Sequence, residues 1–153
     1  MKRNVTIFVA MILFLVFVLA TVSFAQWGMR GRGSGGWGTG NSYGRMYDPN
    51  TVETLVGEVI TVGRITPNRR MSYAVYIIVK TEKETVSVHL GPGWFIDNQD
   101  IKMKLQDRVE VKGSRIFFRG KQAIIAAEVK RGNETLKLRN ESGFSVWSGW
   151  RWR

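Results

Sequence analysis

Residues 86–94 read Val-Ser-Val-His-Leu-Gly-Pro-Gly-Trp, and this stretch decides the fold that we predict. Its first half alternates apolar residues with Ser87 and His89, which is typical of a strand with one buried face. The Gly-Pro-Gly sequence at 91–93 then ends the strand, because proline has no N–H for a β-ladder and glycine allows a sharp change of direction. The apolar residues 94–96 follow, and we predict that they form a short helical plug after a third strand.

Further strands are predicted on both sides of this corner. Two stretches before it, 52–65 and 72–80, and three after it, 108–118, 123–130 and 135–138, are apolar or alternate between apolar and polar residues. No long stretch after the N-terminal segment has helical periodicity. The sequence therefore predicts an all-β domain, a small five- to six-stranded OB-like barrel with the helical plug between strands three and four.

The first predicted strand, 52–65, does not fit a single alternation of buried and exposed positions. Its apolar residues fall on both phases, and it contains Gly57 and Gly63. Glycine permits β-bulges, which let one strand curve around a barrel. We therefore expect bulges at these two positions.

Residues 1–25 are predicted to direct the chain to a membrane. Lys2 and Arg3 precede an uncharged apolar run, and residues 23–25 (Ser-Phe-Ala) place small residues where a signal peptidase reads them. The run from 5 to 25 is also long enough to span a bilayer, so this segment is either a signal peptide or an uncleaved membrane anchor. The positive-inside rule places the rest of the chain outside the cytoplasm. We expect a periplasmic or extracytoplasmic protein, anchored in the inner membrane by residues 5–25 if they are retained.

The remaining chain divides into three parts. Residues 26–47 are rich in Gly, Arg and Trp without an apolar period, which predicts a flexible linker, or alternatively a segment that stacks on nucleotides. Residues 48–139 hold the predicted barrel. Residues 140–153 form a Trp/Arg-rich C-terminal tail, whose last indole and guanidinium groups suit a membrane interface. The candidate membrane-interface residues are Trp150, Arg151, Trp152 and Arg153.

The composition of the chain excludes several kinds of chemistry and favours certain partners. The chain has 153 residues, no cysteine and a formal net charge of +11. Without cysteine there can be no disulfide, thiolate metal site, cysteine nucleophile or covalent haem attachment. With Lys2 and Arg3 assigned to the targeting segment, 11 less 2 leaves a surplus of +9. Such a surplus favours acidic lipid, polysaccharide or nucleic acid as a partner, although it also serves solubility alone.

No catalytic or metal site can be recognised. His89 is the only histidine, and one histidine without cysteine cannot supply the usual ligands of a transition metal. A general base would also need an orienting carboxylate and a nucleophile, and neither is identifiable. We therefore expect a protein that is not an enzyme and that carries no metal or cofactor.

Candidate binding residues follow from the predicted fold. OB-folds bind oligonucleotides or oligosaccharides across the face of their second and third strands, where basic residues would hold an anionic ligand. Trp94 is either a core residue or a ring on which a ligand stacks. The candidates for ligand or partner binding are Tyr76, His89, Trp94, Arg108, Lys112 and Arg115.

Several short stretches also resemble a known family. They are 51–59 (TVETLVGEV), 80–85 (KTEKET), 88–92 (VHLGP), 109–115 (VEVKGSR), 123–129 (AIIAAEV), 138–139 (LR) and 147–150 (WSGW). Together they resemble the domain shared by the magnetosome proteins MamS and MamX and by many small exported bacterial proteins. The resemblance implies an envelope location and a barrel, and it implies no established reaction. Proteins of the MamX type carry haem-attachment motifs, which a chain without cysteine lacks, so a haem or redox function is not carried over.

Together these observations predict a non-catalytic, exported, MamS/MamX-like OB domain that binds or scaffolds a partner in the bacterial cell envelope. The expected partner is an anionic envelope component, either a lipid headgroup or a polysaccharide, or another envelope protein. One alternative is a nucleic-acid-binding OB-fold module, which charge and fold favour and export disfavours. The other is a periplasmic metal or redox accessory protein, which rests mainly on the family resemblance.

Overall fold

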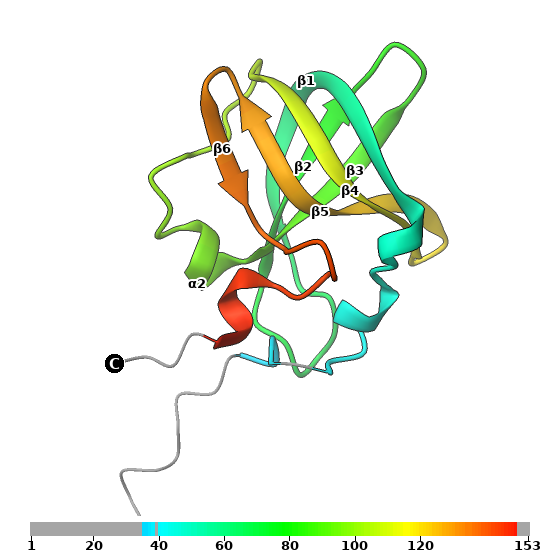
Figure 1. The fold of residues 1–153 in the computed structure, drawn as a ribbon, viewed down its shortest axis with the longest axis vertical. Coiled ribbons are helices and arrows are strands. Elements are labelled where there is room, and N and C mark those ends of the chain that lie inside the picture. Colours follow the sequence, from blue (N-terminus) through cyan, green and yellow to red (C-terminus); the bar gives the residue numbers. More distant parts are fainter. Residues whose placement is uncertain (1–34, 39, 150–153) are drawn as a thin grey trace, which may run out of the picture. The chain divides into compact units, whose positions relative to one another are not determined.

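The computed structural model of the protein describes residues 35–38 and 40–149 (Figure 1). The predicted targeting segment 1–25, the first part of the predicted linker and the four candidate membrane-interface residues at 150–153 lie outside the described residues. Within the described part, no helix is long and apolar enough to cross a membrane.

The described chain is built almost entirely from strands, which confirms the all-β prediction. The strands are β1 (Val52–Ile65), β2 (Ala74–Lys80), β3 (Thr85–Pro92), β4 (Arg108–Phe118), β5 (Lys121–Arg131) and β6 (Glu134–Lys137). The helical elements are short: η1 (Gly44–Met46), η2 (Pro49–Thr51), α2 (Gly93–Ile96) and η3 (Val146–Gly149). The first strand has the predicted bounds, and Asp48 caps η2 by accepting a hydrogen bond from the backbone N–H of Asn50.

The strands form one sheet in the order β3-β2-β1-β4-β5-β6. Neighbours in this order are antiparallel, and β3 also pairs in parallel with β5, with Val88 opposite Ile124. These pairings connect β1, β2, β3, β5 and β4 in a closed circuit, and β6 extends the sheet beyond β5. The apolar side chains that the circuit encloses form the core, and Val59, Ile77, Val88, Val111 and Ile124 are fully buried in it.

Strand β1 is irregular at a different residue from the two that the sequence predicts, Gly57 and Gly63. The register against β2 shifts between Val59 and Thr61, so the irregularity is at Ile60. The two glycines instead allow β2 to approach. A Cβ atom on Gly57 would lie 2.4 Å from the carbonyl oxygen of Lys80, and one on Gly63 would lie 2.7 Å from the ring of Tyr76. Neither position has room for a side chain.

The described end of the predicted linker is part of the folded core. Trp37 is only 2% exposed, and Tyr43 and Tyr47 are also buried. The indole Nε1 of Trp37 donates a hydrogen bond to the carbonyl oxygen of Ser72 at 3.1 Å. Burying an aromatic ring outweighs the conformational freedom of the surrounding glycines, and the three rings lie in irregular chain and short turns rather than in a strand or a long helix. They therefore produce no periodic signal.

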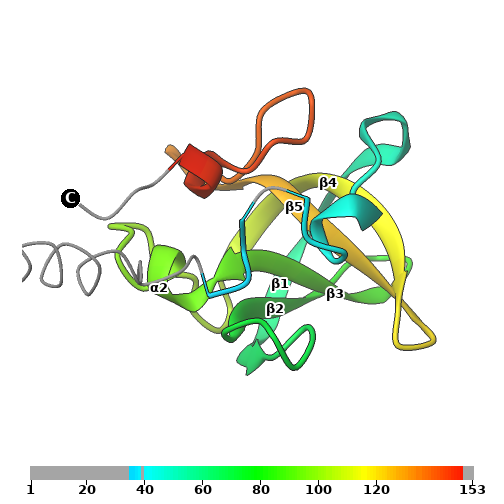
Figure 2. The same ribbon diagram turned by 90° about the horizontal axis from the view of Figure 1, so that it is seen from below.

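The described part of the C-terminal tail returns to the same end of the sheet. Figures 1 and 2 both place this segment (red) beside the N-terminal segment (cyan), and the rings of Trp37 and Trp147 pack edge to face with centroids 6.1 Å apart. Trp147 is buried, whereas Phe144 is 63% exposed. The folded part therefore extends beyond the predicted limits of 48 and 139 on both sides.

The apolar cluster after β3 forms the helix α2, as predicted. Phe95 is 4% exposed and Ile96 is also buried, whereas Trp94 is only partly buried. The main aromatic contribution of the plug to the core is thus Phe95. Its ring packs against Trp147, with centroids 5.3 Å apart.

Candidate functional site

A groove of about 820 Å³ runs across β2 and β3. Its residues come from the end of β1, from β2 and β3, from the loop that joins these two strands, and from the β4–β5 turn with the strand ends on either side of it. They are Arg64, Ile65, Tyr76, Ile78, Glu84, Thr85, Ser87, His89, Phe118, Arg119, Lys121, Gln122 and Ala123. This volume lies within the range of small-molecule and oligomer sites in proteins.

The floor of the groove is formed by the outer phases of β2 and β3. Tyr76 and Ile78 are partly exposed there, because their neighbours Val75, Ile77 and Val79 occupy the buried phase of β2. Ser87 stands opposite Ile78 in the ladder between the strands. The floor therefore offers an aromatic ring, an aliphatic side chain and a hydroxyl.

The rim is held together by Arg119. Its φ of +50° and the following Gly120 form the tight β4–β5 turn. Its Nη2 donates a hydrogen bond to the carbonyl oxygen of Thr66 at 2.6 Å, and its guanidinium carbon lies 4.9 Å from the ring centroid of Phe118. This links the β4–β5 turn to the β1–β2 connection across one end of the groove. The neighbouring Lys121 is exposed, and its ammonium group makes no hydrogen bond or ion pair with the described residues.

The alternation predicts an outward-facing, exposed His89. The phase agrees with the structure, since His89 lines the groove on the outer face of its strand, but the expected exposure is wrong. Its side chain is 3% exposed, because Tyr43 from the N-terminal segment covers it. The Tyr43 hydroxyl lies 2.7 Å from His89 Nδ1, the two rings are stacked with centroids 5.9 Å apart, and Phe118 packs edge-on against the imidazole. Burial, and to a smaller extent the charge of Arg119, lowers the pKa of His89 to about 4, and burial raises the pKa of Tyr43. His89 is therefore neutral at physiological pH, and its Nδ1 atom shares a hydrogen bond with the Tyr43 hydroxyl.

The structure separates the remaining binding candidates. Tyr76 and His89 line the groove, whereas Trp94, Arg108 and Lys112 do not. Arg108 and Lys112 are exposed on β4, and Lys112 lines a different cavity beside Tyr47.

Arg115 is occupied by two carboxylates. Its Nε donates to Glu53 Oε2 at 3.0 Å, its Nη1 donates to Glu84 Oε2 at 3.1 Å, and its Nη2 bonds both carboxylates. These bonds raise the pKa of Arg115 and lower that of Glu84. Arg115 thus joins β1 and β4 to the loop before β3, and its donors are used within the protein.

The candidate set missed Arg119 and Lys121. The signal for them was the sequence Arg-Gly-Lys at 119–121, which predicts a tight turn between strands four and five. In OB-folds that connection borders the ligand face. For metals, the described residues contain no group of three or more His, Asp or Glu side chains that could hold an ion.

The comparison with protein families identifies the domain. The chain matches the MamS/MamX magnetosome protein family over residues 51–136, a range that begins just before β1 and ends within β6. A search of the curated proteins found no match. The matched residues are more than half of the chain and include the whole strand circuit. This chain belongs to the MamS/MamX magnetosome protein family.

Proposed function

We propose that this chain is an exported, non-catalytic OB-like module that binds or scaffolds a partner in the bacterial cell envelope through the groove on β2 and β3. Membership of the MamS/MamX family suggests a magnetosome-associated protein. The closed circuit of five strands, with α2 directly after β3, supports the interpretation as an OB-like barrel.

The position of the groove carries this proposal. OB-folds bind oligomeric ligands on the face of strands two and three, between the connections 1–2 and 4–5. In this protein the groove runs across β2 and β3. At one end it is bordered by Arg119, which is hydrogen-bonded to the β1–β2 connection. The position of the groove therefore agrees with that of the ligand-binding face of OB-folds.

The lining favours an extended anionic ligand. Tyr76 and Ile78 offer apolar contact on the floor, and Lys121 supplies a cation that the described residues leave unpaired. The single carboxylate of the lining, Glu84, is bound to Arg115. Since the sequence predicts export, an acidic polysaccharide is our first choice and nucleic acid our second.

A non-catalytic role is supported by the state of the one imidazole in the groove. The Nδ1 atom of His89 is hydrogen-bonded to Tyr43, and its lowered pKa leaves it a poor proton acceptor near neutral pH. A tyrosine hydroxyl takes the place of the carboxylate that would orient a catalytic histidine.

Binding of alginate oligosaccharides, followed by calorimetry, tests the proposal, with neutral dextran and a single-stranded oligothymidylate as comparison ligands. Lys121→Ser should weaken alginate binding by about threefold or more, because a cation at the rim is lost. Lys137→Ser is the matched control, since Lys137 is an exposed lysine on β6 outside the groove. Preference for oligothymidylate would favour the nucleic-acid module. Equal effects of the two lysine substitutions would contradict the groove as the binding face.

A further inference from the structure

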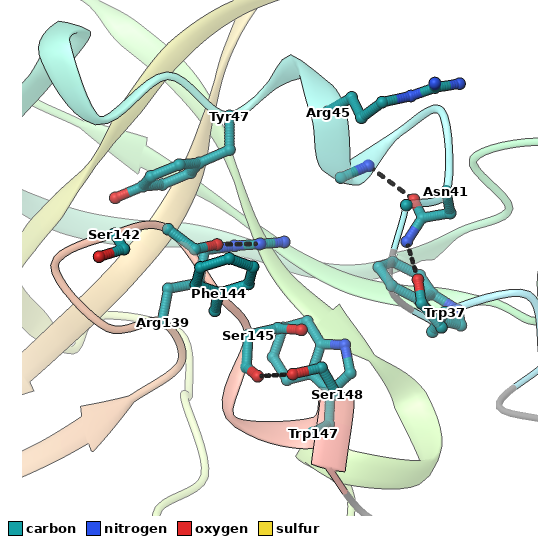
Figure 3. A pocket seen from close by; sticks show the side chains of 14 residues that line it. Trp37, Asn41, Arg45, Tyr47, Arg139, Ser142, Phe144, Ser145, Trp147 and Ser148 are labelled. Carbon is teal, nitrogen blue, oxygen red and sulfur yellow. Dashed lines mark hydrogen bonds between the residues drawn. The ribbon is translucent and has the colours of Figure 1, made fainter.

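A second, smaller pocket lies between the N-terminal and C-terminal segments and shares no lining residue with the groove (Figure 3). Its volume is about 270 Å³. Its lining includes the polar side chains of Asn41, Arg45, Arg139, Ser142 and Ser145 and four aromatic rings, and none of the described residues that line it is acidic. The pocket therefore combines basic and polar groups with aromatic walls.

Arg139 is placed in this pocket by aromatic packing. Its guanidinium carbon lies 5.2 Å from the ring centroid of Tyr47 and 5.4 Å from that of Trp147. The loop after Arg139 approaches Tyr47 closely, because Gly143 has a φ of +84° and a Cβ atom there would lie 2.7 Å from the tyrosine ring. Two rings and a glycine turn thus fix a cation that is largely removed from water, and this burial lowers its pKa.

The hydrogen bonds of Arg139 are incomplete. Nη1 donates to the carbonyl oxygen of Gly143 at 3.0 Å, while Nε is buried and has no acceptor among the described residues. No carboxylate of the described chain lies within ion-pair distance of the guanidinium. A buried charge without a counterion is costly, and a guanidinium presents several N–H donors in a planar fork. The geometry leaves room for an anionic acceptor.

Two hydroxyl donors on the loop after Arg139 also line this pocket. The hydroxyls of Ser142 and Ser145 form no hydrogen bond with the described residues, whereas Ser148 donates to the backbone oxygen of Ser145. Figure 3 shows Arg45 extending away from the group formed by Tyr47, Phe144 and Arg139. Of the two arginines, Arg139 therefore packs against Tyr47 while Arg45 extends outward, and Ser142 and Ser145 lie on the loop that follows Arg139.

We propose that this pocket binds a phosphate group, with Arg139 as its main ligand and Ser142 and Ser145 as additional donors. A guanidinium fork matches the oxygen spacing of phosphate and forms charge-assisted hydrogen bonds with it. The volume of about 270 Å³ suits a phosphate with a small substituent rather than a polymer. The phosphate is either free or carried on a lipid headgroup, and both present the same oxygens.

Calorimetric titration of the full chain with inorganic phosphate, against chloride at equal ionic strength, tests this site. We expect saturable binding that Arg139→Gln weakens by at least about tenfold. Arg45→Gln is the matched control, because it removes the same charge from the same pocket at a side chain that extends outward, and it should change the affinity less than about threefold. No saturable binding by the unaltered chain, or equal affinities of the two variants, would overturn the proposal.

A second variant covers the case in which Arg139→Gln fails to fold. The double substitution Ser142→Ala, Ser145→Ala removes two hydroxyls that the described structure does not use, so it should leave the melting temperature unchanged and lower phosphate affinity several-fold. Unchanged affinity would again overturn the site. Vesicles containing phosphatidic acid distinguish the two sources. Competition by inorganic phosphate for vesicle binding identifies the headgroup as an occupant, and phosphate binding without such competition identifies the free ion.

Discussion

The hydroxyl of Tyr43 lies 2.7 Å from Nδ1 of His89, a contact that joins the N-terminal segment to the central strand β3. The imidazole accepts this bond only when Nδ1 is unprotonated. Protonation of His89 would place a positive charge in a buried site and would leave Nδ1 unable to accept a hydrogen bond. The packing of the N-terminal segment against β3 should therefore depend on pH.

We predict that the protein loses stability as the pH falls below the ordinary pKa of histidine. The pKa of His89 is about 4 in the folded state, against about 6.5 when unfolded, so the unfolded chain binds the proton more readily between these values. The stabilisation is complete above pH 6.5 and is lost as the pH falls toward 4. From about pH 7 to about pH 5 the free energy of unfolding should fall by about 2 kcal/mol.

Urea unfolding at several pH values measures this effect. His89→Asn keeps a hydrogen-bond acceptor near the position of Nδ1 but cannot be protonated, so its stability should change much less over the same range. The partly exposed, salt-bridged carboxylates Glu84 and Asp107 have lowered pKa values, so their contribution is lost in more acidic solution. The same slope in the variant and the natural chain would refute the role of His89.

The plug helix α2 gives a second prediction. Phe95→Ala should destabilise the protein by about 3–5 kcal/mol, because it removes a buried ring that packs against Trp147. Trp94→Ala should cost less, since part of the indole already lies in water in the folded state. Thermal unfolding of the two variants side by side checks this order. A larger loss of stability for Trp94→Ala would show instead that Trp94 is the main aromatic residue of the plug.

The sequence predicted the strands well because their signals are local. The bounds of β1 and the buried phase of β2 follow from β-rich stretches and from alternation. The burial of His89 could not be predicted in this way, because it depends on Tyr43, a residue 46 positions away in a glycine-rich segment. The state of Arg115 likewise depends on two carboxylates from other elements. Alternation gives the phase of a side chain, whereas long-range contacts decide whether that side chain is available to a ligand.

Arg115 provides a third prediction, which concerns stability rather than binding. Arg115→Met should cost about 1–2 kcal/mol, because a network of bidentate bonds with two carboxylates exceeds an isolated surface pair. Lys130→Met is the control, since Lys130 pairs at 3.5 Å or more with Glu128 and Glu110 and is half exposed; its cost should stay within about 0.5 kcal/mol. The deficit of the Arg115 variant should shrink at high salt, where the charges of the natural chain are screened. Urea unfolding at low and high salt measures both quantities, and equal costs for the two variants would contradict the network.

The last prediction concerns the distribution of positive charge. Of the 23 Lys and Arg residues, six lie in residues 1–34 and 150–153, so the described part has 17 against 12 acidic residues, a surplus of only +5. Basic residues near an anionic bilayer each contribute on the order of 1 kcal/mol. Deleting residues 151–153 removes two arginines and a tryptophan while keeping the buried Trp147. The deletion should therefore leave the fold intact and lower binding to anionic vesicles by roughly tenfold or more.

Co-sedimentation with anionic and neutral vesicles at low and physiological salt measures this binding. The ratio between the two vesicle types removes any contribution of the apolar run at 5–25, because that run inserts without regard to headgroup charge. The natural chain should prefer anionic vesicles, most strongly at low salt, since counterions screen the attraction. The control is Lys112→Ser combined with Lys137→Ser, which removes two positive charges from exposed strand positions of the folded part. If this control lowers vesicle binding as much as the deletion does, the whole net charge governs binding and the tail has no special role at the membrane.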